Sequence, residues 1–137
     1  MGNGISGEEF SAEAMEAIPS TLAVNVGSAT TQNVVNVSEI GELYSVSIAA
    51  LDSPLATLTA NLEIQIDAQT TQTLTLYTAG TVNPALVAFA SFVNAGSDFH
   101  VFFPFKCRYG VSLRVGINIS VAASGTLYLG VTRGRKY

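Results

Sequence analysis

Apolar and polar residues alternate strictly in three stretches of the chain, and this alternation constrains the fold more than any other feature. In SLRVGINISV (112–121), every second residue from Leu113 to Val121 is aliphatic. The stretches TLTANLEIQID (57–67) and TLYLGVTR (126–133) repeat the pattern. Successive side chains of a β-strand point to opposite faces, so a period of two indicates one buried and one exposed face. The three stretches are therefore predicted to be half-buried strands.

Weaker strand patterns fill most of the chain that follows Pro19. They cover residues 21–27, 32–38, 43–50, 71–78 and 85–93. Turn-forming residues rich in Gly, Pro, Asn, Asp and Ser separate them. Eight or nine strands at a spacing of about 10–13 residues are typical of an all-β sandwich or barrel. We expect one all-β domain over residues 20–137, a single β-sandwich of the jelly-roll type with about eight strands, and a barrel as the alternative.

The first nineteen residues, MGNGISGEEFSAEAMEAIP, favour a helix instead. Ser6 and Glu9 have the spacing of a capping box, and Pro19 ends the pattern. Phe10 lies on the apolar stripe of this segment and Met15 lies beside it. A helix this short is marginally stable unless it packs on something. We predict an N-terminal arm over residues 1–19, either a short helix or disordered.

Charge is distributed unevenly along the chain. The first eighteen residues hold four glutamates and no base, whereas the last five hold Arg133, Arg135 and Lys136 and no acid. The net charge of −4 argues against a nucleic-acid partner, because phosphate binding requires basic side chains. No apolar run approaches the ~20 residues that a membrane-spanning helix needs. We interpret the end as a basic C-terminal tail, either solvated or in contact with the acidic arm of a neighbouring subunit.

The segment FHVFFPFKCRYG (99–110) holds the one histidine and the one cysteine, which makes it the first candidate for an active site. In a regular strand His100 and Cys107 point to opposite faces and lie about 23 Å apart. A Cys–His dyad needs hydrogen-bond reach of about 3 Å. A single histidine and a single cysteine also cannot form a three-histidine or cysteine-rich zinc site. We predict no enzymatic activity, no metal and no cofactor.

The same segment has the pattern of a contact surface. Its parity sends Phe99, Val101, Phe103, Phe105 and Cys107 inward and leaves an exposed Phe102 on the face that also carries His100 and bases. Outward positions elsewhere are mostly Thr, Ser, Asn and Gln, without the lysines that usually protect sheet edges. We expect a homo-oligomer. The candidate interface residues are Phe10, Met15, His100, Phe102, Lys106, Arg108, Arg133, Arg135 and Lys136.

The last quarter of the chain, FFPFKCRYGVSLRVGINISVAASGTLYLGVTRGRKY (102–137), resembles the ending of many small structural proteins of tailed bacteriophages. An aromatic strand, a Tyr-Gly-Val turn, an alternating strand and a Ser-Gly-Thr step lead into a closing strand. In that pattern the Gly precedes the Tyr and no basic tail follows, so this chain departs from it at both points. The resemblance implies a virion protein on a β-sandwich: a capsid decoration or cement protein, a head–tail protein or a fibre module. It also implies trimers or other rings, with a major capsid protein as a further partner.

Two other functional classes remain open on the sequence. A carbohydrate-binding β-sandwich would use exposed aromatic side chains, for which Tyr44, Tyr77, Tyr109 and Tyr128 are candidates, although the chain has no Trp. A jelly-roll enzyme of the cupin kind ranks last, because a single histidine does not supply the usual metal ligands. We therefore expect a non-enzymatic virion protein, with a carbohydrate-binding module as the alternative.

Overall fold

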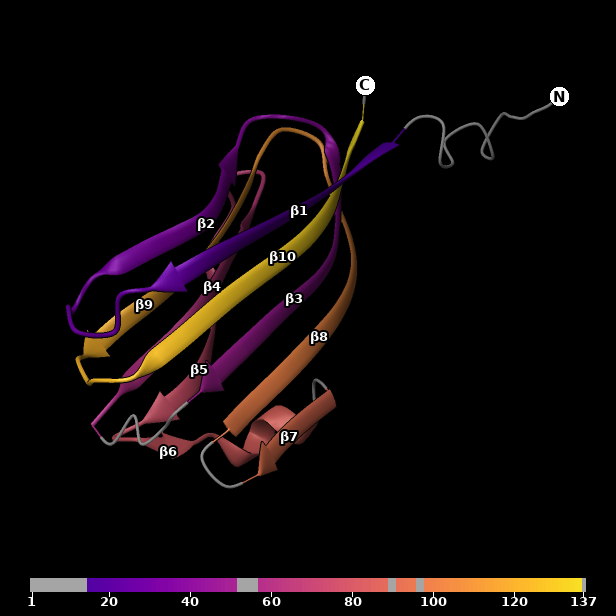
Figure 1. The fold of residues 1–137 in the computed structure, drawn as a ribbon. Coiled ribbons are helices and arrows are strands. Elements are labelled where there is room, and N and C mark those ends of the chain that lie inside the picture. The colour runs from indigo at the N-terminus through magenta and orange to yellow at the C-terminus, as the bar shows by residue number, and fades with distance from the viewer. Residues whose placement is uncertain (1–14, 52–56, 89–90, 96–97, 137) are drawn as a thin grey trace, which may run out of the picture.

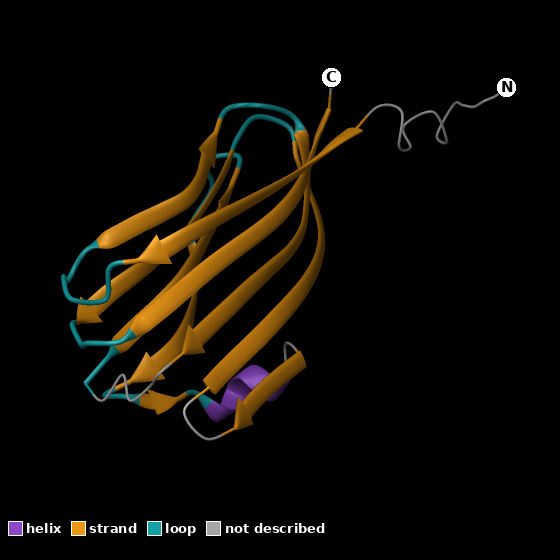
Figure 2. Cartoon of the chain, viewed as in Figure 1, coloured by secondary structure: helices purple, strands orange, loops and turns teal. Residues whose placement is uncertain are grey.

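The chain folds into two five-stranded antiparallel sheets that pack face to face (Figures 1 and 2). The structure, a computed structural model, describes residues 15–51, 57–88, 91–95 and 98–136. The first sheet has the order β1 (Met15–Val24), β10 (Thr126–Lys136), β3 (Gly41–Leu51), β8 (Asp98–Tyr109) and β7 (Ser91–Ala95). The second has the order β2 (Thr31–Val37), β9 (Leu113–Val121), β4 (Thr59–Ile66), β5 (Gln72–Thr78) and β6 (Thr81–Val82).

The strand order is that of a jelly roll, which confirms the predicted fold class. Four antiparallel pairs are nested along the chain: β1 with β10, β2 with β9, β3 with β8 and β4 with β5. Successive pairs belong alternately to the two sheets, as in a long hairpin that has been rolled up. Strand β6, a 3₁₀ helix (η2, Pro84–Ala88) and strand β7 form the connection between β5 and β8.

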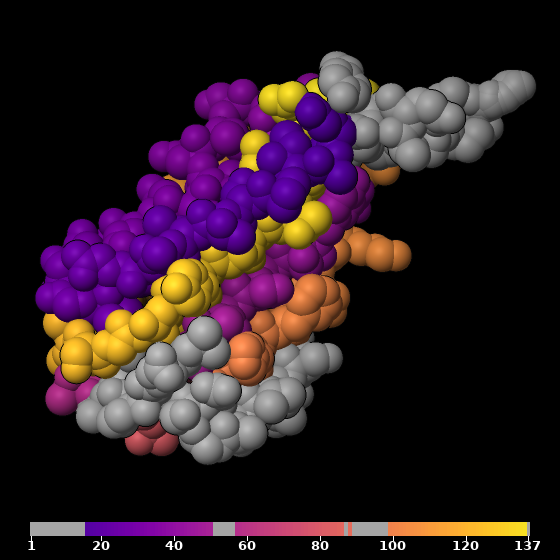
Figure 3. Space-filling model, viewed as in Figure 1, coloured from indigo at the N-terminus to yellow at the C-terminus, as the bar shows by residue number. Residues whose placement is uncertain are grey.

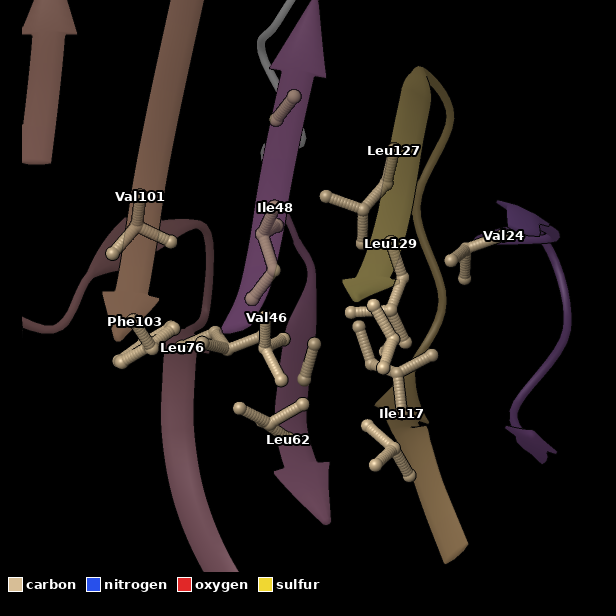
Figure 4. Close-up of a cluster of buried hydrophobic side chains, with 14 of the residues drawn as sticks. Val24, Val46, Ile48, Leu62, Leu76, Val101, Phe103, Ile117, Leu127 and Leu129 are labelled. Carbon is tan, nitrogen blue, oxygen red and sulfur yellow. The ribbon is translucent and has the colours of Figure 1, made fainter. Parts of the chain in front are cut away.

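The aliphatic positions of the alternating stretches form the core between the sheets. Leu62 of β4, Ile117 of β9 and Leu129 of β10 are each at most 2% exposed, and side chains from both sheets meet there (Figure 4). Each such side chain contributes roughly 1.5–3 kcal/mol through burial. Val121 departs from the expected pattern, because it is 48% exposed. The pairing of β9 with β4 shifts by one residue just before Val121, which turns its side chain to solvent.

The boundary of the predicted arm is wrong. Strand β1 begins at Met15 and pairs with β10 along its whole length, so residues 15–19 belong to the sheet and not to a helix. Pro19 is part of this strand, a position it can occupy because β1 is an edge strand and one of its sides needs no N–H donor. Phe10 and the rest of residues 1–14 lie outside the described part of the chain.

The predicted basic tail is also wrong, because its residues lie within β10. Arg133 is only 7% exposed, and its Nε donates to Glu39 Oε2 at 3.0 Å. The Tyr109 hydroxyl donates to the same oxygen at 2.9 Å. The pKa of Tyr109 is raised, mainly by burial and in second place by this hydrogen bond. Arg135 pairs with Glu16 of β1. The acid–base contact between the two ends of the sequence therefore exists within one chain.

A carboxylate joins two turns at one end of the sandwich. Asp67, in the β4–β5 turn, accepts backbone N–H hydrogen bonds from Gly110, Val111 and Ser112 at 2.7–3.1 Å. These hydrogen bonds hold the pKa of Asp67 below its ordinary value, and the one from Ser112 has the largest effect. The residue adopts a left-handed conformation with φ of 53°. The side chain thus ties the β4–β5 turn to the β8–β9 turn.

Candidate functional site

The outer face of the first sheet carries an unusual set of side chains around its centre. Residues paired directly across an antiparallel sheet point to the same side, so the register defines rows of neighbours. Three rows take one residue each from β1, β10, β3 and β8. The rows are Pro19, Thr132, Ser45 and Pro104; Thr21, Gly130, Ser47 and Phe102; and Ala23, Tyr128, Ala49 and His100. None of the twelve is an acid, a lysine or an arginine, and we call them the uncharged face.

Figure 3 looks onto this side of the molecule, where β1 (indigo), β10 (yellow), β3 (magenta) and β8 (orange) form adjacent bands. A shallow trough of about 590 Å³ crosses these strands. Phe102 and Tyr128 stand on either side of it, and each is 44% exposed. Ser47, Ala49 and Gly130 line it between the two aromatic side chains. The uncharged face therefore combines exposed aromatic side chains with a trough of small residues.

Gly130 has no conformational reason to be a glycine. A Cβ at this position would lie 3.9 Å from the nearest atoms, the carbonyl oxygens of Ser20 and Ser47, which is ordinary van der Waals contact. Glycine in the interior of a strand normally lowers stability, and it often marks a place where another backbone or a ligand approaches closely. The absence of a side chain at Gly130 deepens the trough. This position therefore points to a contact made from outside the sheet.

The structure places the predicted residues of β8 as their parity requires. Phe99, Val101 and Phe103 are buried, and His100 and Phe102 are exposed on the uncharged face. Cys107 is half-buried and points away from the face that carries His100. His100 and Cys107 therefore do not form a catalytic pair. The strand contains a bulge beside Pro104, where Phe105 and Lys106 lie opposite the single residue Tyr44 of β3.

The remaining candidates do not join the uncharged face. Lys106 and Arg108 are exposed farther along β8, near its end. Arg133 and Arg135 are held in the ion pairs with Glu39 and Glu16. Met15 pairs with Lys136 where β1 begins and β10 ends. The eight predicted interface residues that the structure describes are thus spread over several regions, and of these eight His100 and Phe102 line the trough.

Sequence reasoning missed most of the trough. Tyr128 was considered only for carbohydrate binding, and the small residues Thr21, Ser47 and Gly130 were not singled out. A usable signal was present in TLYLGVTR (126–133), where the outward positions hold an aromatic residue and then a glycine. That signal becomes specific only when the register brings β10 beside β3 and β8.

The outer face of the second sheet has a different character. Arg114 of β9 donates to Glu63 Oε1 at 3.1 Å and to Asn33 Oδ1 at 3.0 Å, and its side chain also contacts Gln65 and Thr71. Elsewhere on the sheet the side chains of Asn118 and Thr31, and those of Thr75 and Asn61, are hydrogen-bonded to each other. The contact between Arg114 and Glu63 is an ion pair. We call this group of interacting side chains the polar network.

Comparisons and searches of the chain add no specific chemistry. No protein-family model matches the chain, and no curated protein sequence is significantly similar to it. Within the described residues, no three His, Cys, Asp or Glu side chains come together as metal ligands would. No helix in the same part of the chain has the length and apolar character required to cross a membrane. The exposed aromatic side chains and the glycine-lined trough make the uncharged face the candidate functional site.

Proposed function

We propose that this protein is a non-enzymatic structural subunit of a viral particle and that it assembles with copies of itself through the uncharged face. The observation that carries the proposal is the trough between Phe102 and Tyr128, lined by a glycine that the strand does not require. Burial of exposed aromatic surface favours association, and the twelve residues bring no formal charge that would have to be desolvated. Such a surface is suited to close packing against another protein.

The fold and the sequence pattern are compatible with a place in a virion. Jelly rolls form the subunits of many viral capsids, although lectins and cupins share the architecture. The resemblance of residues 102–137 to structural proteins of tailed bacteriophages favours the virion among these classes. The positions that this proposal includes are capsid decoration or cement, the head–tail junction and a fibre. A closed ring such as a trimer, docked on a major capsid protein, is the expected state.

The test compares the same substitution on the two outer faces. Ser47 and Ser120 are both exposed strand serines, the first in the trough and the second on β9 of the second sheet. We expect Ser47→Lys to convert the oligomer into a monomer, because it places an ammonium group within the buried contact. Ser120→Lys should keep the mass of the wild type. Light scattering coupled to size-exclusion chromatography measures both, and a monomeric wild-type protein would overturn the proposal.

A carbohydrate-binding module is the second candidate, and the same trough supports it. Tyr128 and Phe102 offer ring faces, and the hydroxyl groups of Thr21 and Ser47 lie between or beside them. Sugars bind proteins through ring stacking combined with hydrogen bonds to hydroxyl groups. If this function holds, Tyr128→Ala should abolish binding on a glycan array and leave the oligomeric mass unchanged. An array without hits would exclude this candidate.

A further inference from the structure

A second apolar depression lies at the open side of the sandwich, and Pro104 is the one lining residue that it shares with the uncharged face. It has a volume of about 400 Å³ and lies between β4 and β5 of the second sheet and β8 of the first. Apolar side chains of all three strands line it, with two polar residues of β5 at its mouth; we call it the slot. Its lining residues are Leu62, Ile64, Gln72, Thr73, Leu74, Phe103, Pro104 and Phe105.

The slot is open because the short strands of the connection stop before they reach it. Strand β7 pairs with β8 only from Asp98 to Phe102, and β6 pairs with β5 only at Tyr77 and Thr78. Within the described residues, no strand pairs with β8 on this side beyond Phe102. Pro104 has no N–H, so a continuous strand cannot be added here without losing a hydrogen bond. The slot is therefore suited to an apolar side chain from an incoming segment and not to a full β-ladder.

Residues 1–14, MGNGISGEEFSAEA, have the chemistry that matches this place. Phe10 is their largest apolar side chain, and Glu8, Glu9 and Glu13 accompany it without any base. On β8, Lys106 follows the slot and is exposed, and Arg108 is exposed two residues later. The chain thus combines an acidic segment that carries one phenyl group with an apolar depression that has the exposed base Lys106 beside it. Opposite charges of this kind steer an encounter and fix its register.

The reach of the segment identifies which copy provides it. Glu16, Arg135, Gly41 and Tyr109 form one row across the sheet, so Met15 lies about 14 Å across the sheet from the end of β8. The slot lies roughly a further 16 Å along β8, which gives a separation of about 22 Å. Five Cα–Cα steps separate Phe10 from Met15, and they span at most about 18 Å. The backbone of residue 10 therefore stops short of the slot in its own chain, and the phenyl ring reaches the slot only when the whole segment is fully extended in one direction.

We infer that the slot receives Phe10 from the N-terminal segment of a second copy of this chain. The inference rests on the self-assembly proposed above and adds a second, separate contact to it. In the assembled form the N-terminal segment of one subunit crosses to its neighbour and seats its phenyl ring among Leu74, Phe103 and Phe105. The glutamates of the segment lie beside Lys106 of the same neighbour.

A mixed cross-linking experiment tests the inference on full-length protein. One partner is Ser11→Cys with Cys107→Ser, and the other is a size-tagged Gln72→Cys with Cys107→Ser. Ser11 is next to Phe10, and Gln72 is an exposed residue of the slot that pairs with Ile64 and shares its side of the sheet. Mild oxidation should give a covalent heterodimer. The matched control replaces Gln72→Cys by Ser120→Cys, which places the thiol on the outer face of the same sheet and should give no heterodimer above background.

A further variant and a single-chain control complete the test. Phe10→Ala, added to the Ser11→Cys partner, should reduce the heterodimer yield more than about tenfold, because aromatic anchors dominate such contacts. Absence of the heterodimer, or an equal yield with Ser120→Cys, would overturn the inference. So would an intrachain disulfide in Ser11→Cys/Gln72→Cys/Cys107→Ser without any covalent dimer. If Ser47→Lys still produces a monomer in that case, the proposed function stands and the inference alone falls.

Discussion

The outer faces of the two sheets carry different kinds of side chains: hydrogen-bonded polar groups on the second sheet, and exposed aromatic and small uncharged groups on the first. On the second sheet, the Arg114 guanidinium group donates to side chains around it, so the polar network forms its hydrogen bonds within the chain. On the first sheet, Phe102 and Tyr128 are exposed and no charged residue lies in the three rows around them. The fold requires both sheets to bury their inner faces, but it places no such demand on the outer ones. This difference is what we expect if the polar network serves stability and the uncharged face makes the proposed contact between subunits.

The largest expected effect comes from placing a charge on the uncharged face. We expect Phe102→Asp to raise the dissociation constant of the oligomer at least about 30-fold, as for the loss of a central aromatic anchor. The melting temperature should change little, since the side chain is 44% exposed. Analytical ultracentrifugation measures the first quantity and circular dichroism the second. Phe102→Leu, which keeps an apolar side chain, should retain the assembled mass, and an unchanged mass for Phe102→Asp would refute the role of this face.

The reverse experiment removes the centre of the polar network. Arg114→Ala should lower the free energy of unfolding by about 1–2 kcal/mol, because Glu63 and Asn33 lose a partly buried, charged donor. Urea denaturation followed by circular dichroism measures this loss. Lys106→Ala, a change of an exposed base on the first sheet, should alter stability by less than about 0.5 kcal/mol. A change of oligomeric mass in Arg114→Ala without a loss of stability would mean that the two faces have been assigned the wrong roles.

Two glycines, one on each sheet, sharpen the comparison further. Gly130→Ala should leave stability unchanged or raise it by up to about 1 kcal/mol, while it weakens assembly because the trough becomes shallower. Gly116→Ala should destabilise the fold, because its Cβ would lie 2.8 Å from the Gln32 carbonyl oxygen. Thermal melts and light scattering on both variants give the four values. Tighter assembly of Gly130→Ala would contradict the proposed contact.

The smallest expected effect is on the stability of the fold at low pH, and it comes from a turn residue that belongs to neither outer face. The pKa of Asp67 is lowered in the folded state, so its stabilising contribution is complete above the ordinary value of 3.8 and disappears as the pH falls below that value. We expect Asp67→Asn to lower the melting temperature slightly at pH 7 and to reduce the further loss between pH 4 and the folded pKa. Melting curves from pH 7 to pH 2 measure this. Parallel pH profiles for the variant and the wild type would exclude the effect.

The sequence carried enough information for the architecture and the core. The two-residue period of the strands around Leu62, Ile117 and Leu129 follows from local strand geometry, so the apolar positions that it predicts to be buried are buried in the structure. Val121 shows where that reasoning ends, because a one-residue shift in pairing depends on the partner strand and leaves no mark in the period. The start of β1 was missed for a similar reason: pairing with β10 overrides a weak helical tendency.

The candidate site could be predicted only in part. The exposure of Phe102 follows from parity along one strand, and it was anticipated. The trough depends on four strands that lie far apart in the sequence, and no local pattern shows that Tyr128 and Gly130 become neighbours of Ser47 and Phe102. Arg133 is the clearest case, because its partner Glu39 is 94 positions away in the sequence. A basic end of a chain has no local feature that distinguishes a free tail from a buried ion pair.

The position of β10 has a consequence for how the protein is made. Strand β10, the last of the described strands, lies between β1 and β3, inside the first sheet and not at its edge (Figure 1). Until Thr126–Lys136 emerges, β1 lacks its pairing partner in that sheet, and Glu39 lacks Arg133. A nascent chain therefore cannot complete the first sheet before Thr126–Lys136 has been synthesised. A chain that terminates before Thr126 lacks the strand that joins β1 to the rest of this sheet.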